Sequence, residues 1–159
     1  MADGMRRPLL IGVGMDMAGD DTVGREIAQR LRGHAGFDVA ETHGMAADLV
    51  TLMEGRDRVL IVDACRSGAP PGTIHRLNAT SGALPPFLNT VSSHGMGVAE
   101  AVRLGQSLGM LPPHCDIWAI EGAVFRPGAP LSPPVAEAAD SSVATIPGVL
   151  TGAEPPPRP

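Results

Sequence analysis

Short apolar runs alternate along the chain with segments whose apolar residues recur every three or four positions. Residues 8–13 (PLLIGV), 58–63 (RVLIVD) and 116–120 (DIWAI) are the clearest runs, and each is rich in large or branched apolar side chains. Runs of this kind are typical of strands buried on both faces of a parallel sheet. Two weaker runs predict further strands at 37–41 and 73–77.

The segments between these runs have helical periodicity. Residues 22–32 form the clearest example, and Asp20, Asp21 and Thr22 at its start are capping residue types. Aspartates at this position favour a helix start, one as a cap and the other through the positive end of the helix dipole. Further helices are predicted over 47–53, 95–108 and 135–146. Strands that alternate with helices predict an α/β fold, a three-layer αβα sandwich with a mostly parallel central sheet.

The length and composition suit one globular domain. The chain has 159 residues, of which 43% are hydrophobic and 18% are charged. These values are typical of a folded domain with a core of its own. We assign residues 1–146 to this domain. Residues 147–159 hold five prolines and are predicted to be a disordered tail.

The charge pattern excludes two classes of function. The formal net charge is −5, and all 12 basic residues are Arg, with no run longer than Arg6-Arg7. A nucleic-acid surface needs clustered cations, so no nucleic-acid partner is expected. No apolar run approaches the roughly 20 residues of a membrane span. No export signal is recognisable either, so we expect a cytoplasmic protein whose Cys65 and Cys115 are free thiols.

Loops at predicted strand and helix ends carry the candidates for chemistry. Ligands of open parallel sheets bind beyond the carboxyl ends of the strands. The pair Asp20-Asp21 follows the first strand, Asp63 ends a buried strand, and His94 precedes a helix. Two carboxylates and one imidazole suit a borderline divalent ion such as Zn²⁺, Ni²⁺, Mn²⁺ or Fe²⁺, or an acid–base site. The residue types alone leave both readings open.

Other motifs in the same loops are weaker. Gly12-x-Gly14 resembles part of a dinucleotide fingerprint, but Met17 stands where the third glycine belongs. Cys65 is interpreted as a small buried side chain rather than a nucleophile, because no activating basic group is evident beside it. The remaining histidines have no ligand partners at metal spacing in the sequence: His34, His43, His75 and His114.

Four segments together resemble the hydrogenase maturation protease family. That family has a Gly-x-Gly-Asn turn followed by an acidic pair and a glycine, a strand ending in Asp-Ala before a Pro-Gly-Thr turn, a Ser-x-His helix start, and a late Gly-x-x-Leu-Ser-Pro-x-Val segment. The corresponding residues are Gly12-Val13-Gly14-Met15 with Asp20-Asp21 and Gly24, Val62-Asp63-Ala64 with Pro71-Gly72-Thr73, Ser92-Ser93-His94, and Gly128 to Val135. The resemblance extends over about residues 8–146.

The resemblance implies a substrate and a set of roles. It implies an endopeptidase that removes the C-terminal extension of a nickel-loaded NiFe-hydrogenase large-subunit precursor. Asp21, Asp63 and His94 would bind the nickel that the precursor carries and would form the catalytic site, without an organic cofactor. The family likeness also implies a monomeric αβα sandwich. Met15 departs from the family Asn, and Asp21 stands where Glu also occurs.

Several mechanisms and rival functions fit these residues. Either the ion activates water, or it positions the scissile bond while Asp21 or Asp63 acts as general base. A non-catalytic nickel-binding maturation factor or a metallopeptidase with another substrate would share the same ligands. A receiver-like signalling domain also carries an acidic pair and a strand-end Asp, but it requires a Lys, and this chain has none.

Overall fold

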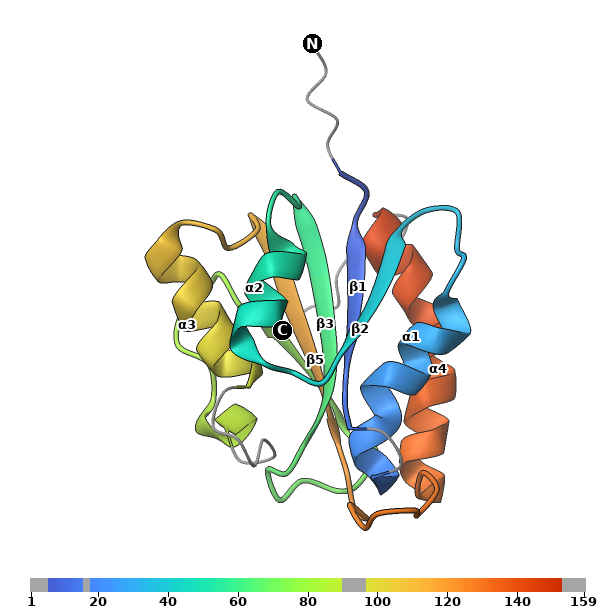
Figure 1. Ribbon diagram of the computed structural model, residues 1–159. Coiled ribbons are helices and arrows are strands. Elements are labelled where there is room, and N and C mark those ends of the chain that lie inside the picture. Colours follow the sequence, from blue (N-terminus) through green and yellow to red (C-terminus); the bar gives the residue numbers. More distant parts are fainter. Residues whose placement is uncertain (1–5, 16–17, 90–96, 153–159) are drawn as a thin grey trace.

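A five-stranded sheet lies between two pairs of helices (Figure 1). The computed structural model describes residues 6–15, 18–89 and 97–152. The strands are β1 (Leu9–Val13), β2 (Asp38–Thr42), β3 (Arg58–Cys65), β4 (Ile74–Asn78) and β5 (His114–Glu121). The α-helices are α1 (Val23–Leu31), α2 (Ala46–Met53), α3 (Val98–Leu108) and α4 (Pro133–Thr151), and the short 3-10 helices are η1 (Gly19–Thr22) and η2 (Pro86–Asn89).

The strand order places a topological switch point between β1 and β3. The order is β2-β1-β3-β5-β4, and only the edge strand β4 runs antiparallel to its neighbour. The connection from β1 leads to β2 on one side, whereas β3 continues the sheet on the other side. In such sheets the crevice for a ligand opens at the carboxyl ends of the two strands where the order reverses. These ends lie at the lower edge of the sheet in Figure 1.

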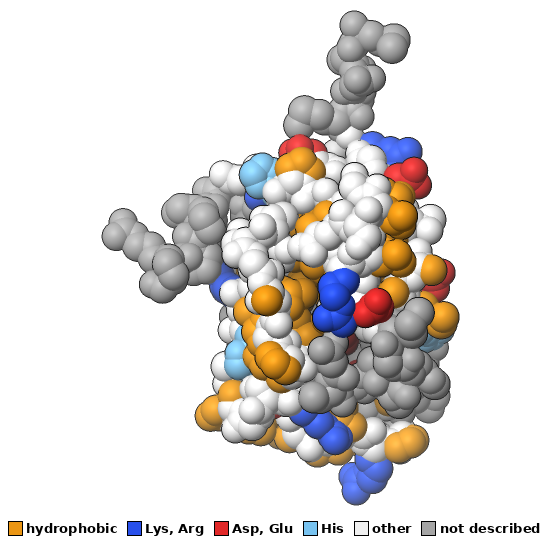
Figure 2. Space-filling view, turned by 90° about the vertical axis from the view of Figure 1, so that its left-hand side faces the viewer, with side chains coloured by type: hydrophobic (Ala, Val, Ile, Leu, Met, Phe, Trp, Pro, Cys, Tyr) orange, Lys and Arg blue, Asp and Glu red, His pale blue; other side chains and the backbone are white. Residues whose placement is uncertain are grey.

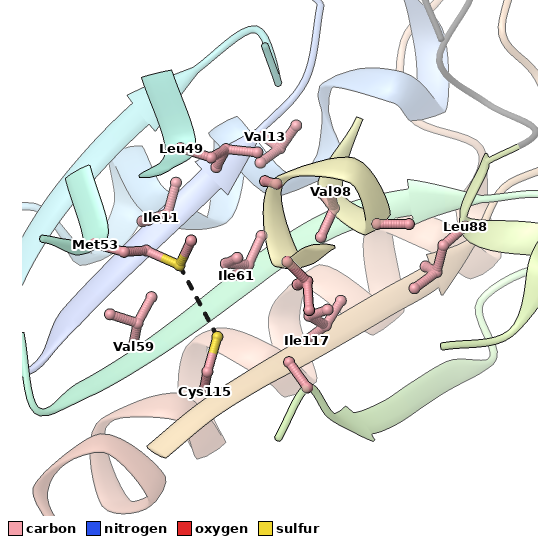
Figure 3. Packing of buried hydrophobic residues seen from close by; sticks show 14 of the residues in the cluster. Ile11, Val13, Leu49, Met53, Val59, Ile61, Leu88, Val98, Cys115 and Ile117 are labelled. Carbon is pink, nitrogen blue, oxygen red and sulfur yellow. Dashed lines mark hydrogen bonds between the residues drawn. The ribbon is translucent and has the colours of Figure 1, made fainter. Parts of the chain in front are cut away.

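Alternate residues of the strands belong to two separate hydrophobic cores, one on each face of the sheet. Ile11 and Ile61 belong to the cluster beneath α2 and α3, whereas Leu10 and Leu60 belong to the cluster beneath α1 and α4. Figure 3 shows the first cluster, in which Met53 of α2 contacts Cys115 of β5, with sulfur atoms 4.0 Å apart. Because both faces of the sheet are covered, the central strands have no polar face. The continuous apolar runs therefore predicted the α/β sandwich correctly.

Glycines allow α1 to lie directly against the sheet. A Cβ atom at Gly24 would stand 2.2 Å from the carbonyl oxygen of Val62 and 2.4 Å from that of Val13. A Cβ atom at Gly12 would stand 2.3 Å from the carbonyl oxygen of Gly24. The Gly12-x-Gly14 segment thus serves close packing of strand and helix. This contact fixes η1, which carries Asp21, against the carboxyl end of β1.

Most predicted elements match the structure within a few residues, and the tail differs most. Helix α4 continues to Thr151, so the predicted domain end at residue 146 is wrong, and so is disorder beginning at 147. Pro147 lies inside this helix, and Ile146 and Leu150 are buried on its inner side. Burial of this apolar face outweighs the hydrogen bond that Pro147 cannot donate. Residues 153–159 lie outside the described part of the chain.

Helices α2 and α3 form the side of the molecule that faces the viewer in Figure 2, where apolar side chains are interspersed with a few charged ones. The large hydrophobic side chains that are exposed among the described residues are Met15, Met45 and Leu108. Within the same residues, none of the helices combines the length and the apolar character needed to span a bilayer.

Candidate active site

The structure brings Asp21 and Asp63 together at the switch point. Asp21 lies in η1, directly after β1, and Asp63 lies near the carboxyl end of the adjacent strand β3. The two carboxylates are close enough that the charge of Asp21 raises the pKa of Asp63. Both side chains are partly exposed. Two of the three predicted site residues therefore share one edge of the sheet, and the third, His94, lies outside the described residues.

Burial makes both carboxyl groups harder to ionise. Burial raises the pKa of Asp21 to about 6, against the opposing effects of the Met15 backbone N–H and the positive charge of Arg66. Burial also raises the pKa of Asp63 well above its usual value. The neighbouring Asp21 raises it further, and the Ala64 N–H, 2.8 Å from Oδ1, opposes the shift. Paired acids with raised pKa values suit proton transfer, or binding of a cation that offsets their repulsion.

Asp20 has a different role from its neighbour. Its side chain is fully buried and accepts hydrogen bonds from the backbone N–H groups of Ala123, Val124 and Ser132 and from the Ser132 hydroxyl, at 2.7 to 2.9 Å. Burial opposes ionisation, but these donors prevail, and the pKa of Asp20 is lowered. Asp20 therefore anchors the loop between β5 and α4. Thr22, the third of the predicted capping residues, occupies the N-cap of α1, so neither aspartate caps this helix.

The departure at Met15 leaves a contact with the site intact. The backbone N–H of Met15 bonds to the Asp21 carboxylate. The Met15 side chain is 41% exposed. Because the main-chain N–H makes this hydrogen bond, the presence of Met in place of the family Asn does not remove it.

Replacing Asp21 by Asn is expected to stabilise the folded protein at neutral pH. The folded-state pKa of about 6 exceeds the ordinary 3.8, so the native state binds more protons than the unfolded state between these values. Stability therefore falls as the pH rises from about 4 to about 6 and stays lowered above that. The Asn variant avoids this loss of unfolding free energy, which is on the order of 1–2 kcal/mol when the partial exposure of the side chain is taken into account.

Thermal unfolding followed by circular dichroism from pH 3.5 to 8 measures this effect. We expect the melting temperatures of the Asn variant and the wild type to converge near pH 4 and to separate as the pH rises. The control is Asp48→Asn, which changes an exposed aspartate in the first turn of α2. A separation that is constant at all pH values would contradict the assignment of a raised pKa to Asp21.

A second polar cluster, which the sequence did not predict, lies at the end of β3 beside β5 and β4. Cys65, His75 and Glu121 offer one donor atom each, and these atoms all lie within 4.8 Å of one another. In the sequence, His75 has no partner at metal spacing, and Glu121 lies one residue beyond the predicted last strand. Their positions could have indicated the cluster, because Cys65 and Glu121 each come shortly after a strongly predicted strand. Cys65 is fully buried, as predicted, and both cysteines are free thiols.

Comparisons with known proteins agree with this architecture. A family model described as hydrogenase maturation protease matches residues 22–148. An endopeptidase from Escherichia coli matches with a TM-score of 0.79 and 22% identity, over 92% of this chain and 93% of that one. The hydrogenase maturating endopeptidase HybD from E. coli matches with a TM-score of 0.74 and 21% identity, over 92% of this chain and 93% of that one. The NiFe-hydrogenase maturation protease HybD from Thermococcus kodakarensis matches with a TM-score of 0.69 and 20% identity, over 91% of this chain and 99% of that one.

At these identities the solved structures show a shared fold. The search among curated proteins found no match.

Proposed function

Because the chain belongs to the hydrogenase maturation protease family, we propose that this endopeptidase removes the C-terminal extension of a nickel-loaded NiFe-hydrogenase large-subunit precursor. The observation that carries the proposal is the pair Asp21 and Asp63 at the switch point of the sheet, where each carboxyl group has a raised pKa. Such a pair suits hydrolysis beside a cation that the substrate supplies. A receiver-like signalling role is set aside by family membership.

The donor set fits nickel as part of the substrate. Asp21 and Asp63 supply carboxylate oxygens, and we assign the third donor to His94. Two carboxylates and an imidazole suit a borderline divalent ion. A cation brought by the precursor would offset the repulsion between the two acids and favour their ionised forms. Recognition would then depend on completed nickel insertion, and the bound ion would position the scissile bond.

The chain's own carboxylates would perform the hydrolytic step. In this aspartyl-type reaction, Asp63 or Asp21 accepts a proton from water as the water attacks the scissile carbonyl carbon. The tetrahedral intermediate collapses when the peptide C–N bond breaks and the leaving amine takes up the proton that the carboxyl group had accepted from water. The Ala64 N–H bond to Oδ1 orients the Asp63 carboxyl group. We place the reaction in the cytoplasm, with the enzyme acting as a monomer and without nucleic acid or membrane.

Intact-mass spectrometry of a large-subunit precursor tests the proposal. The precursor is incubated with the protein after loading with nickel, and in parallel without nickel. We expect a mass loss equal to a C-terminal peptide in the nickel-loaded sample alone. Asp48→Asn serves as the control variant with an exposed acid altered. An unchanged mass with a verified nickel-loaded precursor would favour a non-catalytic nickel-binding maturation factor instead.

A further inference from the structure

A cluster of three potential metal ligands lies where β3, β5 and β4 meet. Cys65 is the last residue of β3 and pairs in register with Glu121, the last residue of β5. His75 lies on β4, in register with Ala119 of β5. Cys65 Sγ is 3.6 Å from Glu121 Oε1, and His75 Nε2 is 3.2 Å from the same oxygen. We propose that Cys65, His75 and Glu121 form a binding site for a divalent ion of the Zn²⁺ class, separate from the Asp21–Asp63 pair.

The spacing of the donor atoms fits tetrahedral coordination. Bonds of about 2.0 to 2.3 Å from Zn²⁺ to nitrogen, oxygen and sulfur place neighbouring donors roughly 3.3 to 3.7 Å apart. The two distances from Glu121 Oε1, 3.2 and 3.6 Å, are close to these values, and all three donor atoms lie within 4.8 Å of one another. Sulfur, imidazole nitrogen and carboxylate oxygen together favour a borderline ion over Mg²⁺ or Ca²⁺, which prefer oxygen donors.

Neighbouring groups already orient the ligands. The backbone N–H groups of Ser67 and Gly68 donate to Glu121 Oε2, at 2.8 and 3.4 Å. The other oxygen, Oε1, faces Cys65 and His75 and also accepts a hydrogen bond from the Ser67 hydroxyl. The His75 ring packs against Phe87, with ring centroids 4.9 Å apart. Groups that fix the orientation of ligands in this way are a regular feature of metal sites.

Burial and access also suit an ion. Glu121 is 3% exposed, and Cys65 is fully buried. The side chain of His75 is 22% exposed, and Ser67 is exposed, so the cluster lies next to the protein surface. A thiolate and a carboxylate would neutralise the charge of a divalent ion. The expected consequence is that the ion ties the antiparallel edge strand β4 to the ends of β3 and β5.

Two other roles for the cluster are less well supported. Ser67 Oγ lies 3.3 Å from His75 Nε2, but Glu121 faces the same ring nitrogen. A nucleophile–base–acid relay needs the acid at the opposite nitrogen, so this arrangement does not build one. The second alternative is a metal-free hydrogen-bonded latch between Glu121, Ser67 and His75. Measurement of ion binding separates the latch from the metal site.

Co²⁺ titration of the full chain tests the proposal. The parent protein carries Asp21→Asn and Asp63→Asn, so that the candidate active site does not contribute carboxylate ligands. We expect one Co²⁺ per chain, with a thiolate-to-metal charge-transfer absorption that Zn²⁺ displaces. Cys65→Ser should abolish this absorption, and Glu121→Gln should weaken Co²⁺ binding by at least about 100-fold. Cys115→Ser is the matched control, since Cys115 is buried against Met53 instead.

The parent protein itself can overturn the proposal, even if a variant fails to fold. Absence of the thiolate absorption in the folded parent would leave the metal-free latch. Absorption that persists in Cys65→Ser, or disappears in Cys115→Ser, would show adventitious binding elsewhere. Zn²⁺ should also raise the melting temperature of the parent and of Cys115→Ser, but not that of Glu121→Gln. This experiment measures ion binding and involves no precursor, so a negative result would not bear on the proposed protease function.

Discussion

Asp63→Asn is expected to lower the rate of precursor cleavage by about 10²- to 10⁴-fold or more, because the site loses a proton acceptor and a nickel ligand. Asn has nearly the same shape and keeps an oxygen to accept the Ala64 N–H bond. The folded structure should therefore be retained. Its stability at neutral pH should not fall, because burial and the charge of Asp21 disfavour ionisation of the native aspartate. Cleavage is measured by intact mass under single-turnover conditions.

Asp116→Asn is the matched control for this experiment. Asp116 is another partly exposed aspartate on a sheet strand, and burial raises its pKa too. It lies on β5 nearer the amino end, where it is in register with Leu60 rather than with Asp63. We expect this variant to cleave like the wild type. Wild-type processing by Asp63→Asn would exclude Asp63 from the reaction and would remove the central element of the proposed mechanism.

Asp20→Ala is expected to be the most destabilising change at this edge of the sheet. The substitution removes one buried carboxylate that accepts four hydrogen bonds from Ala123, Val124 and Ser132. Three backbone N–H groups would lose this acceptor, and each unsatisfied buried donor costs about 1–3 kcal/mol. We expect a loss of at least about 3 kcal/mol, which corresponds to a fall in melting temperature of roughly 6–12 °C for a chain of this size.

Comparison with Asp21→Asn tests whether the loss of stability in Asp20→Ala comes from the hydrogen bonds of Asp20. That variant alters the adjacent carboxylate, which has a raised pKa and is expected to stabilise the protein when neutralised. The stability of both variants is measured by urea unfolding at pH 7. The lowered pKa of Asp20 also predicts that the stability it provides is present above the ordinary aspartate pKa and is lost as the pH falls below it. Equal effects of the two substitutions would contradict the division of roles.

Part of the candidate site could be predicted from single positions. Asp63 ends the predicted apolar strand 58–63, where a carboxylate is costly unless it has a partner or a function. Position after the first strand indicated only the pair Asp20-Asp21, and the family resemblance implied Asp21. The contribution of His94 stays a prediction. The cluster of Cys65, His75 and Glu121 was not predicted, because its members come from three strands and share no spacing in the sequence.

The sequence by itself determined the alternation of strands and helices and the α/β class, because apolar periodicity is a local property that records which faces are buried. Only the tertiary structure decided that Asp20, the neighbour of the Asp21 implied by the resemblance, would anchor a distant loop. Asp20 meets the donors of a loop more than 100 positions away, whereas Asp21 meets Asp63. The end of α4 was likewise decided by packing, since Ile146 and Leu150 are buried on either side of Pro147. These outcomes depend on which distant groups come together, and a local pattern does not record that.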